Sequence, residues 1–520
     1  MDKIKILWAD DEIDLLKPHL LFLSQKGYEV ITATNGHDAV ETFLENTNDI
    51  DVVFLDESMP GLTGLETLPR IKEVNPAIPV VMITKNEAEH VMEEAIGSQI
   101  SDYLIKPVNP NQILLTLKKI IDNKRLIREK TTQEYQQEFR QLFMQITGGL
   151  NYEEWFDVYR KIVQWELRLD DNRAEVGDIL AQQKEQANTE FSKYVIKNYF
   201  DWVDKRGDKA GPVMSHEVLR RFVFPHTGTG LPSIVLLLDN LRYDQWKIIE
   251  PFLNELFRTE QEDYFYSILP TATQYSRNAI FAGMMPADIE QAFPDKWKND
   301  AEEGGKNLFE DFFLGKHVER VFRKGIKWDY IKVTNVSHAK ELQDNILNYL
   351  NNDLTVIVYN FIDMLSHART EMEVLKELAG DERAYRSLTR SWFLHSPLWA
   401  ALRRLEGRPV QVFVTTDHGT IRVKRPSKVV GDRETTTNLR YKLGRNLQFE
   451  PKDVLTIKDP KQAGLPRPNV SSAYIFAKED YFFLYPNNYN HYHNYYKNTF
   501  QHGGISLEEM LCPIVRLRSK

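Results

Sequence analysis

Short apolar runs that end in polar residues alternate with helical patterns over about the first 120 residues. Strands are predicted at residues 5–9, 51–55, 80–83 and 101–105. Strands that alternate with helices form parallel sheets with crossover connections. We therefore expect a doubly wound, flavodoxin-like α/β domain in this part of the chain.

The middle of the chain is predicted to be helical. Residues 111–147 contain neither Gly nor Pro and keep apolar residues at helical spacing until Gly148-Gly149. Two more helices are predicted at 152–169 and about 174–203, with Trp155 and Tyr159 in the core of a small bundle. Residues 205–230 contain several glycines and two prolines, which indicates a linker.

Apolar strands return after residue 230. The runs at 233–238, 355–361, 410–415 and 513–517 are separated by helical stretches such as 342–350. This pattern predicts a second α/β domain. We therefore divide the chain into an α/β domain at 1–122, a helical connector at 123–205, and an α/β domain at 206–520.

Composition narrows the class of protein. A chain of 520 residues is too long for one compact domain, and a net charge of −9 argues against broad coating by nucleic acid, although a local basic groove stays open. Cys512 is the only cysteine, so no intrachain disulfide can form, and an apolar neighbourhood predicts that it is buried. The chain opens without a basic segment followed by a long apolar core, so we expect no signal peptide. The apolar runs elsewhere are too short to span a bilayer as helices, so we expect a soluble, cytoplasmic protein.

Polar side chains follow each strand predicted in the first domain. Asp10 and Asp11 follow the first strand, Asp56 the second, Thr84 the third and Lys106 the fourth. Clustered carboxylates select a hard cation such as Mg²⁺. That cation and Lys106 would neutralise a phosphoryl group on Asp56, and Thr84 could hydrogen-bond to it.

These residues, in this order, resemble the receiver domain of bacterial response regulators. The alternative, solvated loop carboxylates, fits any one of them but not the whole set. The resemblance implies a sensor histidine kinase as partner. It also implies a role for each residue: Asp56 as phosphoacceptor, Asp10 and Asp11 with Asp56 at the Mg²⁺ site, Thr84 and Lys106 as switch residues, and Tyr103 as their aromatic partner. For Tyr103, partly buried packing is the alternative.

The strands predicted in the last domain also end in candidate ligands. Asp239, Asp363 and Asp417 each follow a strand, and carboxyl ends of parallel strands are where such sheets bind ligands. His418 is adjacent to Asp417, and His367 stands at Asp-x3-His spacing from Asp363. Each has a plain structural alternative: Asp363 as a helix cap, His367 as a packed histidine, and Asp417-His418 as an ordinary loop.

Thr271 stands after Pro270, where an apolar helical pattern is predicted to begin. If Thr271 has only a structural role, it would be the N-cap of that helix. The same place would set a developing alkoxide beside the positive end of a helix and near a bound metal. Late in the chain, His502 precedes Gly503-Gly504, and glycines let backbone approach a crowded site.

Asp, His and Thr residues in this order, with Asp-His-Gly after a strand and His-Gly-Gly near the end, resemble the alkaline phosphatase superfamily and its PglZ-type branch. The resemblance covers roughly residues 206–520 and implies two zinc ions. One would be held by Asp239, Thr271, Asp417 and His418, and the other by Asp363, His367 and His502. It further implies Thr271 as a nucleophile that forms a phosphothreonine, which water then hydrolyses.

Several other residues have two readings. His491 and His493 compete with His502 as ligands but stand in a Tyr- and Asn-rich stretch whose tyrosines could stack on nucleobases or simply pack. The basic stretch 422–433 could bind a polyanionic substrate or be a solvated loop. We expect five other histidines to be structural or to lie at the surface: His216, His226, His317, His338 and His395.

The order of the three parts resembles the PorX-type two-component response regulators, which are linked to type IX secretion. The resemblance implies a zinc-dependent phosphodiesterase acting on oligonucleotides, including cyclic ones, and a phosphorylation-dependent homodimer. The main alternative is a signalling adaptor whose metal domain binds a sigma factor or a secretion component. A phosphomonoesterase or sulfatase is weaker, because sulfatases modify Cys or Ser and Thr271 cannot become formylglycine.

Overall fold

The computed structural model describes residues 3–47, 49–85, 100–169, 173–204, 211–300, 302, 304–360 and 381–520, and for 122–133 and 173–176 it describes the backbone only. The chain forms two compact units, Met1–Glu134 and Tyr135–Lys520, and each is described by itself. Helix α5 (Pro110–Thr147) begins in the first unit and ends in the second.

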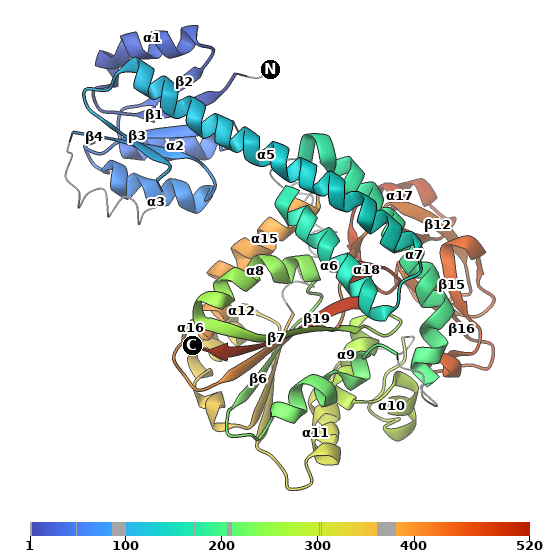
Figure 1. Ribbon diagram of the computed structural model, residues 1–520. Helices are drawn as coiled ribbons and strands as arrows, with labels where there is room; N and C mark the ends of the chain where they lie inside the picture. Colours follow the sequence, from blue (N-terminus) through green and yellow to red (C-terminus); the bar gives the residue numbers. More distant parts are fainter. Residues whose placement is uncertain are drawn as a thin grey trace. The chain divides into compact units, whose positions relative to one another are not determined.

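The first unit contains a parallel sheet in the order β2-β1-β3-β4-β5 (Figure 1). Its strands are β1 (Lys5–Ala9), β2 (Glu29–Ala33), β3 (Val52–Asp56), β4 (Val80–Thr84) and β5 (Asp102–Ile105). Its helices, besides the start of α5, include η1 (Ile13–Leu16), α1 (Lys17–Gln25), α2 (Gly36–Glu45) and α3 (Gly64–Val74). This order confirms the flavodoxin-like fold.

Strand β2 was missing from the sequence prediction, which placed only helical patterns between residues 9 and 51. It is an edge strand, and four of its five residues are exposed or half-buried. By contrast, every residue of β3 and β4 is buried, so these two strands appear as continuous apolar runs in the sequence. The difference explains why the central strands were predicted and the edge strand was not.

Two long helices open the second unit, α6 (Tyr152–Leu169) and α7 (Arg173–Asp204), and they confirm the predicted helical region. They do not form a bundle with a core of its own. The ring of Phe156 on α6 stacks on Tyr264 at 4.0 Å between centroids, and Tyr159 packs against Tyr243. The apolar faces of α6 and α7 therefore belong to the same hydrophobic core as the sheet that follows.

That sheet has six strands in the order β7-β19-β10-β6-β9-β8. The strands are β6 (Ser233–Leu238), β7 (Phe257–Tyr266), β8 (Trp328–Val333), β9 (Leu354–Tyr359), β10 (Gln411–Thr415) and β19 (Leu511–Ser519). Strand β19 runs antiparallel to both its neighbours, β10 and β7, whereas β10, β6, β9 and β8 are parallel. This confirms an α/β domain after the helical region.

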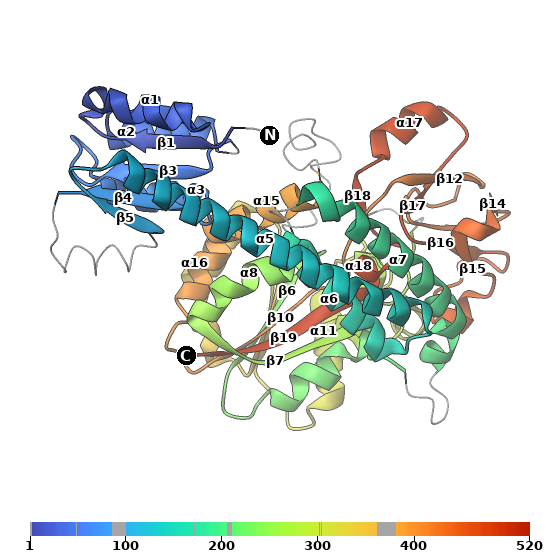
Figure 2. The same ribbon diagram turned by 45° about the horizontal axis from the view of Figure 1, so that its top comes forward.

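Helices cover both faces of this sheet (Figures 1 and 2). One group comprises α8 (Tyr243–Leu256), α12 (Val336–Asn345), α15 (Glu382–His395) and α16 (Pro397–Arg403), and the other contains α9 (Thr273–Ala282) and α11 (Glu310–Val321). Shorter helical segments are α10 (Pro286–Ala292), η6 (Asn348–Asn351), η7 (Pro451–Asp453), η8 (Pro460–Ala463), α17 (Tyr489–Tyr496) and α18 (Leu507–Met510).

Three small sheets complete the unit, in the orders β11-β18, β14-β12-β17 and β13-β16-β15. Their strands are β11 (Ile421–Arg422), β12 (Arg425–Val430), β13 (Tyr441–Gly444), β14 (Gln448–Phe449), β15 (Val454–Ile457), β16 (Ala473–Ala477), β17 (Tyr481–Leu484) and β18 (Phe500–Gln501). They lie between β10 and β19 in sequence, so the chain leaves the main sheet and returns to it for its last strand.

The segment predicted as a linker is in large part structured. Within it lie η3 (Ser215–Glu217), η4 (Leu219–Val223) and η5 (Phe224–His226). Met214, Leu219 and Val223 are fully buried, which a solvated linker would not allow. Cys512 is buried, as predicted. Among the helices that the structure describes, none is long and apolar enough to span a bilayer.

Candidate metal centre and phosphorylation site

One edge of the six-stranded sheet collects the polar residues of the second unit. Asp239 follows β6, and Asp417 and His418 follow β10, so parallel strands deliver them to the same edge. Strand β7 leads from that edge into residues 267–272. Because β19 runs the other way, the segment before it, with His502, returns there as well.

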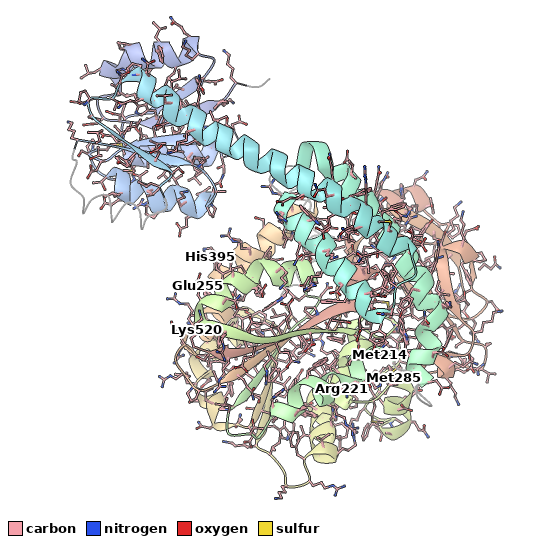
Figure 3. All side chains as sticks on the ribbon, in the orientation of Figure 1. Met214, Arg221, Glu255, Met285, His395 and Lys520 are labelled. Atoms are coloured by element: carbon pink, nitrogen blue, oxygen red, sulfur yellow. The ribbon has the colours of Figure 1, made fainter. Side chains whose placement is uncertain are left out.

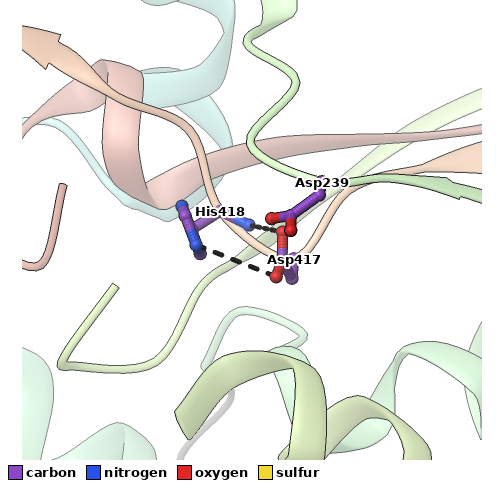
Figure 4. Close-up of side chains that lie close together, drawn as sticks. All are labelled: Asp239, Asp417 and His418. Atoms are coloured by element: carbon purple, nitrogen blue, oxygen red, sulfur yellow. Dashed lines mark hydrogen bonds and ion pairs between the residues drawn. The ribbon is translucent and has the colours of Figure 1, made fainter. Parts of the chain in front are cut away.

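Asp239, Asp417 and His418 form a compact buried cluster (Figure 4). Ligand atoms from these three side chains lie within 4.8 Å of one another. The Nδ1 of His418 is 3.0 Å from the carbonyl oxygen of Gly419. A carbonyl can only accept a hydrogen bond, so Nδ1 carries a proton whether the ring is neutral or charged. Nε2 is therefore the nitrogen that faces the cluster and, in the neutral ring, offers a lone pair to a metal.

The electrostatics of the cluster favour an ionised carboxylate. Burial by itself would raise the pKa of Asp417, but the neighbouring His418, the Arg277 guanidinium and the backbone N–H of Asn240 outweigh it and lower the pKa to about 2. The Oδ1 atom of Asp417 accepts the N–H groups of His418 at 3.0 Å and of Asn240 at 3.3 Å. Asp417 is therefore fixed in orientation and negatively charged.

A threonine hydroxyl points into the cluster, but it belongs to Thr273. Its Oγ1 is 3.1 Å from Nε2 of His418 and 3.5 Å from Oδ1 of Asp239. Thr273 is the first residue of α9, so it also stands at the positive end of the helix. Sequence reasoning missed this residue, because the helical pattern is compatible with a start at either threonine.

Thr271, the predicted nucleophile, lies just outside the helix, which begins two residues later than predicted. Its hydroxyl donates to the carbonyl oxygen of Gly504 at 2.9 Å and accepts the N–H of Gly503 at 3.1 Å. The side chain is fully buried. Thr271 therefore ties its own loop to the glycines that follow His502.

His502 lies beside the cluster rather than within it. Its ring stacks on that of His418, with centroids 4.3 Å apart, and its Nδ1 is 3.2 Å from the carbonyl oxygen of Thr271. The glycines after it are needed: Gly503 has φ +121°, and a Cβ on Gly504 would lie 2.4 Å from the carbonyl oxygen of Ala477. The predicted close approach of backbone is therefore present.

The other two predicted zinc ligands, Asp363 and His367, lie outside the described residues. The cluster that is described suits Zn²⁺, since two carboxylates and an imidazole nitrogen are ligands this ion accepts. The residues therefore fit the metal that the fold family implies at this one position. Of the three ligands predicted for a second zinc ion, only His502 lies within the described residues.

Helix α7 supports both segments that flank the cluster, which the sequence did not indicate. The Asn188 side chain accepts the N–H of Leu507 at 2.8 Å and donates to Glu508 at 3.1 Å. Farther along the helix, the hydroxyl of Tyr199 accepts the N–H of Leu269 at 2.8 Å. One helix thus holds the chain after His502 and the chain before Thr271.

The first unit brings together the residues predicted for phosphorylation. Ligand atoms of Asp10, Asp11 and Asp56 lie within 4.8 Å of one another, a set of three carboxylates that suits Mg²⁺. Lys106 Nζ lies 2.9 Å from Asp56 and 3.0 Å from Asp10. Burial raises the pKa of Asp56, with help from the charges of Asp10 and Asp11, while Lys106 opposes the rise.

The predicted switch residue Thr84 and its predicted aromatic partner Tyr103 differ in their surroundings. The Thr84 hydroxyl donates to the carboxylate of Glu57. Tyr103 is 43 % exposed. A side chain exposed to this extent is compatible with a switch role and also with partly buried packing, so the role of Tyr103 stays a prediction.

The structure shows the contacts of some residues in the basic stretch and in the tyrosine-rich stretch. In the basic stretch, Lys424 pairs with Glu185, and Arg425 pairs with Glu479 and Asp480, so these two cations are neutralised within the chain. On α17, aromatic rings one turn apart stack on each other, as Tyr492 and Tyr496 do.

Among the histidines set aside, His317 is buried, with Nδ1 3.1 Å from the carbonyl oxygen of Phe281. His395 is exposed at the end of α15 (Figure 3). The structure therefore agrees with their assignment as structural and surface residues.

Comparison with known proteins adds three matches to families in chain order. The model of the response regulator receiver domain matches residues 6–118, that of the PorX response regulator linker domain matches 125–203, and that of the BREX system PglZ alkaline phosphatase-like domain matches 218–517. The last match covers more than half of the chain.

Curated relatives match about a quarter of the chain. Transcriptional regulatory protein ZraR of Klebsiella oxytoca is 35% identical over 132 residues, which are 25% of this chain and 29% of that protein. Transcriptional regulatory protein ResD of Bacillus subtilis is 30% identical over 120 residues, 23% of this chain and 49% of that protein. The chain thus spans less than a third of ZraR and about half of ResD.

Solved structures also match about a quarter of the chain. A response regulator receiver domain protein from Clostridium thermocellum is 33% identical, with 24% of this chain and 98% of that chain covered and a TM-score of 0.23.

The three family matches, together with the two α/β folds and the helices between them, identify the architecture. The chain belongs to the PglZ alkaline phosphatase-like family and is a PorX-type two-component response regulator, with receiver, linker and PglZ domain in that order.

Proposed function

We propose that the PglZ domain is a zinc-dependent phosphodiesterase with Thr273 as its nucleophile. One observation carries this proposal: the Thr273 hydroxyl lies 3.1 Å from His418 Nε2, at the mouth of a buried cluster with Asp239 and Asp417. A hydroxyl in that place can be activated by an adjacent base or metal. The role expected for Thr271 passes to Thr273, because the Thr271 hydroxyl is engaged by Gly503 and Gly504.

The chain's own residues would perform the following steps. Thr273 Oγ1 releases its proton to solvent as it forms a bond to phosphorus, the ester P–O bond breaks, and the leaving oxygen takes up a proton from solvent. A water molecule then attacks phosphorus, the bond between Thr273 Oγ1 and phosphorus breaks, and a proton of that water restores the Thr273 hydroxyl. The net reaction is hydrolysis of one ester bond. Bound zinc, held by Asp239, Asp417 and His418, would supply Lewis acidity toward the attacking oxygen.

The proposal includes a second zinc, with Asp363, His367 and His502 as ligands, as the family resemblance implies. It also includes Asp56 as the phosphoacceptor, with Asp10 and Asp11 at a Mg²⁺ site and a sensor histidine kinase as phosphate source. Lys106 supports the assignment of Asp56, since its ammonium group lies 2.9 Å from that carboxylate. Thr84 and Lys106 remain the proposed switch residues, with Tyr103 as their aromatic partner.

We extend the proposal to biology on family resemblance alone. The substrate would be an oligonucleotide, including cyclic ones, and the regulated process would be type IX secretion. Phosphorylation would promote a homodimer. The match to the PorX response regulator linker domain supports the family resemblance on which these parts of the proposal rest.

The test compares the two threonines in the full-length, zinc-loaded protein with bis-p-nitrophenyl phosphate as substrate. Thr273→Val is expected to reduce hydrolysis to background. Thr271→Val is expected to keep measurable hydrolysis, with a stability loss of about 1–3 kcal/mol because the buried Gly503 N–H loses its acceptor. The reverse pattern would return the role to Thr271. Equal rates in all three proteins, or zinc content near zero, would sink the enzyme proposal.

A further inference from the structure

Arg277 is the one cation among the described residues that contacts both cluster carboxylates. Its Nη2 lies 2.5 Å from Oδ2 of Asp239, and its Nε lies 3.1 Å from Oδ2 of Asp417. The side chain is fully buried. Arg277 follows Thr273 by one helical turn on α9, so one face of that helix presents both the hydroxyl and the guanidinium to the cluster.

The Arg277 guanidinium also contacts residues outside the cluster, which fix its position. Its Nη1 donates to Asn360 Oδ1 at 3.0 Å, at the end of β9, and its Nε lies 3.4 Å from Oε1 of Glu310. Glu310 is buried, accepts the hydroxyl of Tyr330 at 2.5 Å and pairs with Lys332 at 2.6 Å. With its own partners fixed, Arg277 has little freedom to move away from the carboxylates.

Two buried carboxylates side by side repel each other and lose solvation, so they need a positive partner to keep their charge and spacing. A guanidinium is suited to this task because its rigid fork presents several N–H groups at fixed angles. Arg277 engages one oxygen of each carboxylate. That contact leaves the other oxygen of Asp239 toward Thr273, at 3.5 Å.

We propose that Arg277 is a positioning residue for the metal centre, which orients Asp239 and Asp417 so that they can bind a divalent cation together with His418. The inference rests on the proposed function only in that the cluster binds zinc. Partners that hydrogen-bond to metal ligands orient them, and their removal typically weakens metal binding by about 10–100-fold. A competing hypothesis predicts the opposite change in zinc affinity. If the Arg277 guanidinium merely occupies the place of the metal ion, it weakens zinc binding, and its removal would strengthen zinc binding.

The test measures zinc affinity of the full-length protein by competition with a chromogenic chelator, with the melting temperature in EDTA as a check on folding. Arg277→Met is expected to bind zinc about 10–100-fold more weakly. Arg277→Lys should recover part of the loss, since a single ammonium can pair with one carboxylate but cannot bridge two. Glu310→Gln, which loosens Arg277 without touching the cluster, should lose less than Arg277→Met.

The outcomes separate this inference from the proposed function. Wild-type affinity in Arg277→Lys and Glu310→Gln would overturn the positioning role alone, and so would a lower melting temperature with unchanged affinity in Arg277→Met. Tighter binding in Arg277→Met would also overturn it and identify the guanidinium as a place-holder. If Arg277→Met fails to fold, the other two variants decide. A wild type without zinc affinity would overturn both proposals.

Discussion

Thr84 donates its hydroxyl hydrogen bond to the carboxylate of Glu57, the residue next to the proposed phosphoacceptor Asp56. A phosphoryl group on Asp56 would bring a charge of about −1.5 to −2 and strong acceptor oxygens close to that contact. Thr84 would have to leave Glu57 to reach a phosphoryl oxygen. On the proposed phosphorylation of Asp56, the Glu57 carboxylate would therefore oppose the phosphorylated state in two ways, by holding Thr84 and by like-charge repulsion.

Removing that carboxylate should favour phosphorylation. We expect Glu57→Ala to reach half-maximal phosphorylation at a lower acetyl phosphate concentration than wild type, by roughly tenfold if about 1.4 kcal/mol is relieved. Phosphate-affinity gels at steady state would measure the phosphorylated fraction. Glu73→Ala, which removes an exposed carboxylate on α3, is the matched control. Superimposable curves for Glu57→Ala and wild type would contradict the role given to Glu57.

Asp56→Asn should abolish the change in oligomeric state caused by acetyl phosphate. An amide cannot form an acyl phosphate, whereas the carboxylate beside Lys106 can, so only the wild type is expected to shift toward a dimer. Sedimentation velocity with Mg²⁺ measures the shift. The exposed Asp14→Asn serves as control and should behave as wild type. The same shift in Asp56→Asn would mean that the receiver is not the switch.

How much of this molecule could be predicted depends on whether a signal is local. Strand β6 was predicted at its observed bounds, Ser233–Leu238, because a strand buried on both faces is one continuous apolar run. Asp239, Asp363 and Asp417 were predicted at one edge because parallel strands end at a common edge. Local patterns sufficed for these predictions, whereas the grouping of Asp239, Asp417 and His418 around one metal came from the family resemblance.

Contacts between distant residues could not be read in the same way. Arg277 meets Asp417 across 140 positions, and Asn188 meets Leu507 across 319, so only the packed fold brings them together. Thr273 was missed for a different reason, which is local. It stands two residues from Thr271 in the same helical pattern, and an error of two residues in the predicted start of a helix lies within the usual uncertainty of a helix boundary. That ambiguity explains why the sequence singled out Thr271 and not Thr273, the residue that we propose as nucleophile.

Asn188→Ala should destabilise the second unit. The substitution leaves the buried N–H of Leu507 without its acceptor and removes a donor from Glu508, which together should cost about 1–3 kcal/mol. Thr189→Ala, which alters the neighbouring position on α7 where the hydroxyl bonds only within the helix, should cost less. Denaturant unfolding followed by tryptophan fluorescence would compare them. Equal losses would indicate that Asn188 is an ordinary helix position.

Lys442 should make stability depend on pH. It is 1 % exposed, its Nζ donates to the carbonyl oxygen of Thr436 at 2.9 Å, and burial lowers its pKa from 10.5 to about 7. The unfolded chain therefore binds this proton more tightly than the folded chain does. The charged lysine thus lowers the free energy of unfolding, in full below pH 7 and not at all above pH 10.5.

Lys442→Met should be more stable than wild type at pH 7, by up to about 5 kcal/mol, less the loss of one hydrogen bond, and this difference should shrink steadily toward pH 9.5. Urea unfolding across that range tests this, with the exposed Lys452→Met as control. A difference from wild type that stays constant with pH would show that Lys442 is not the titrating group.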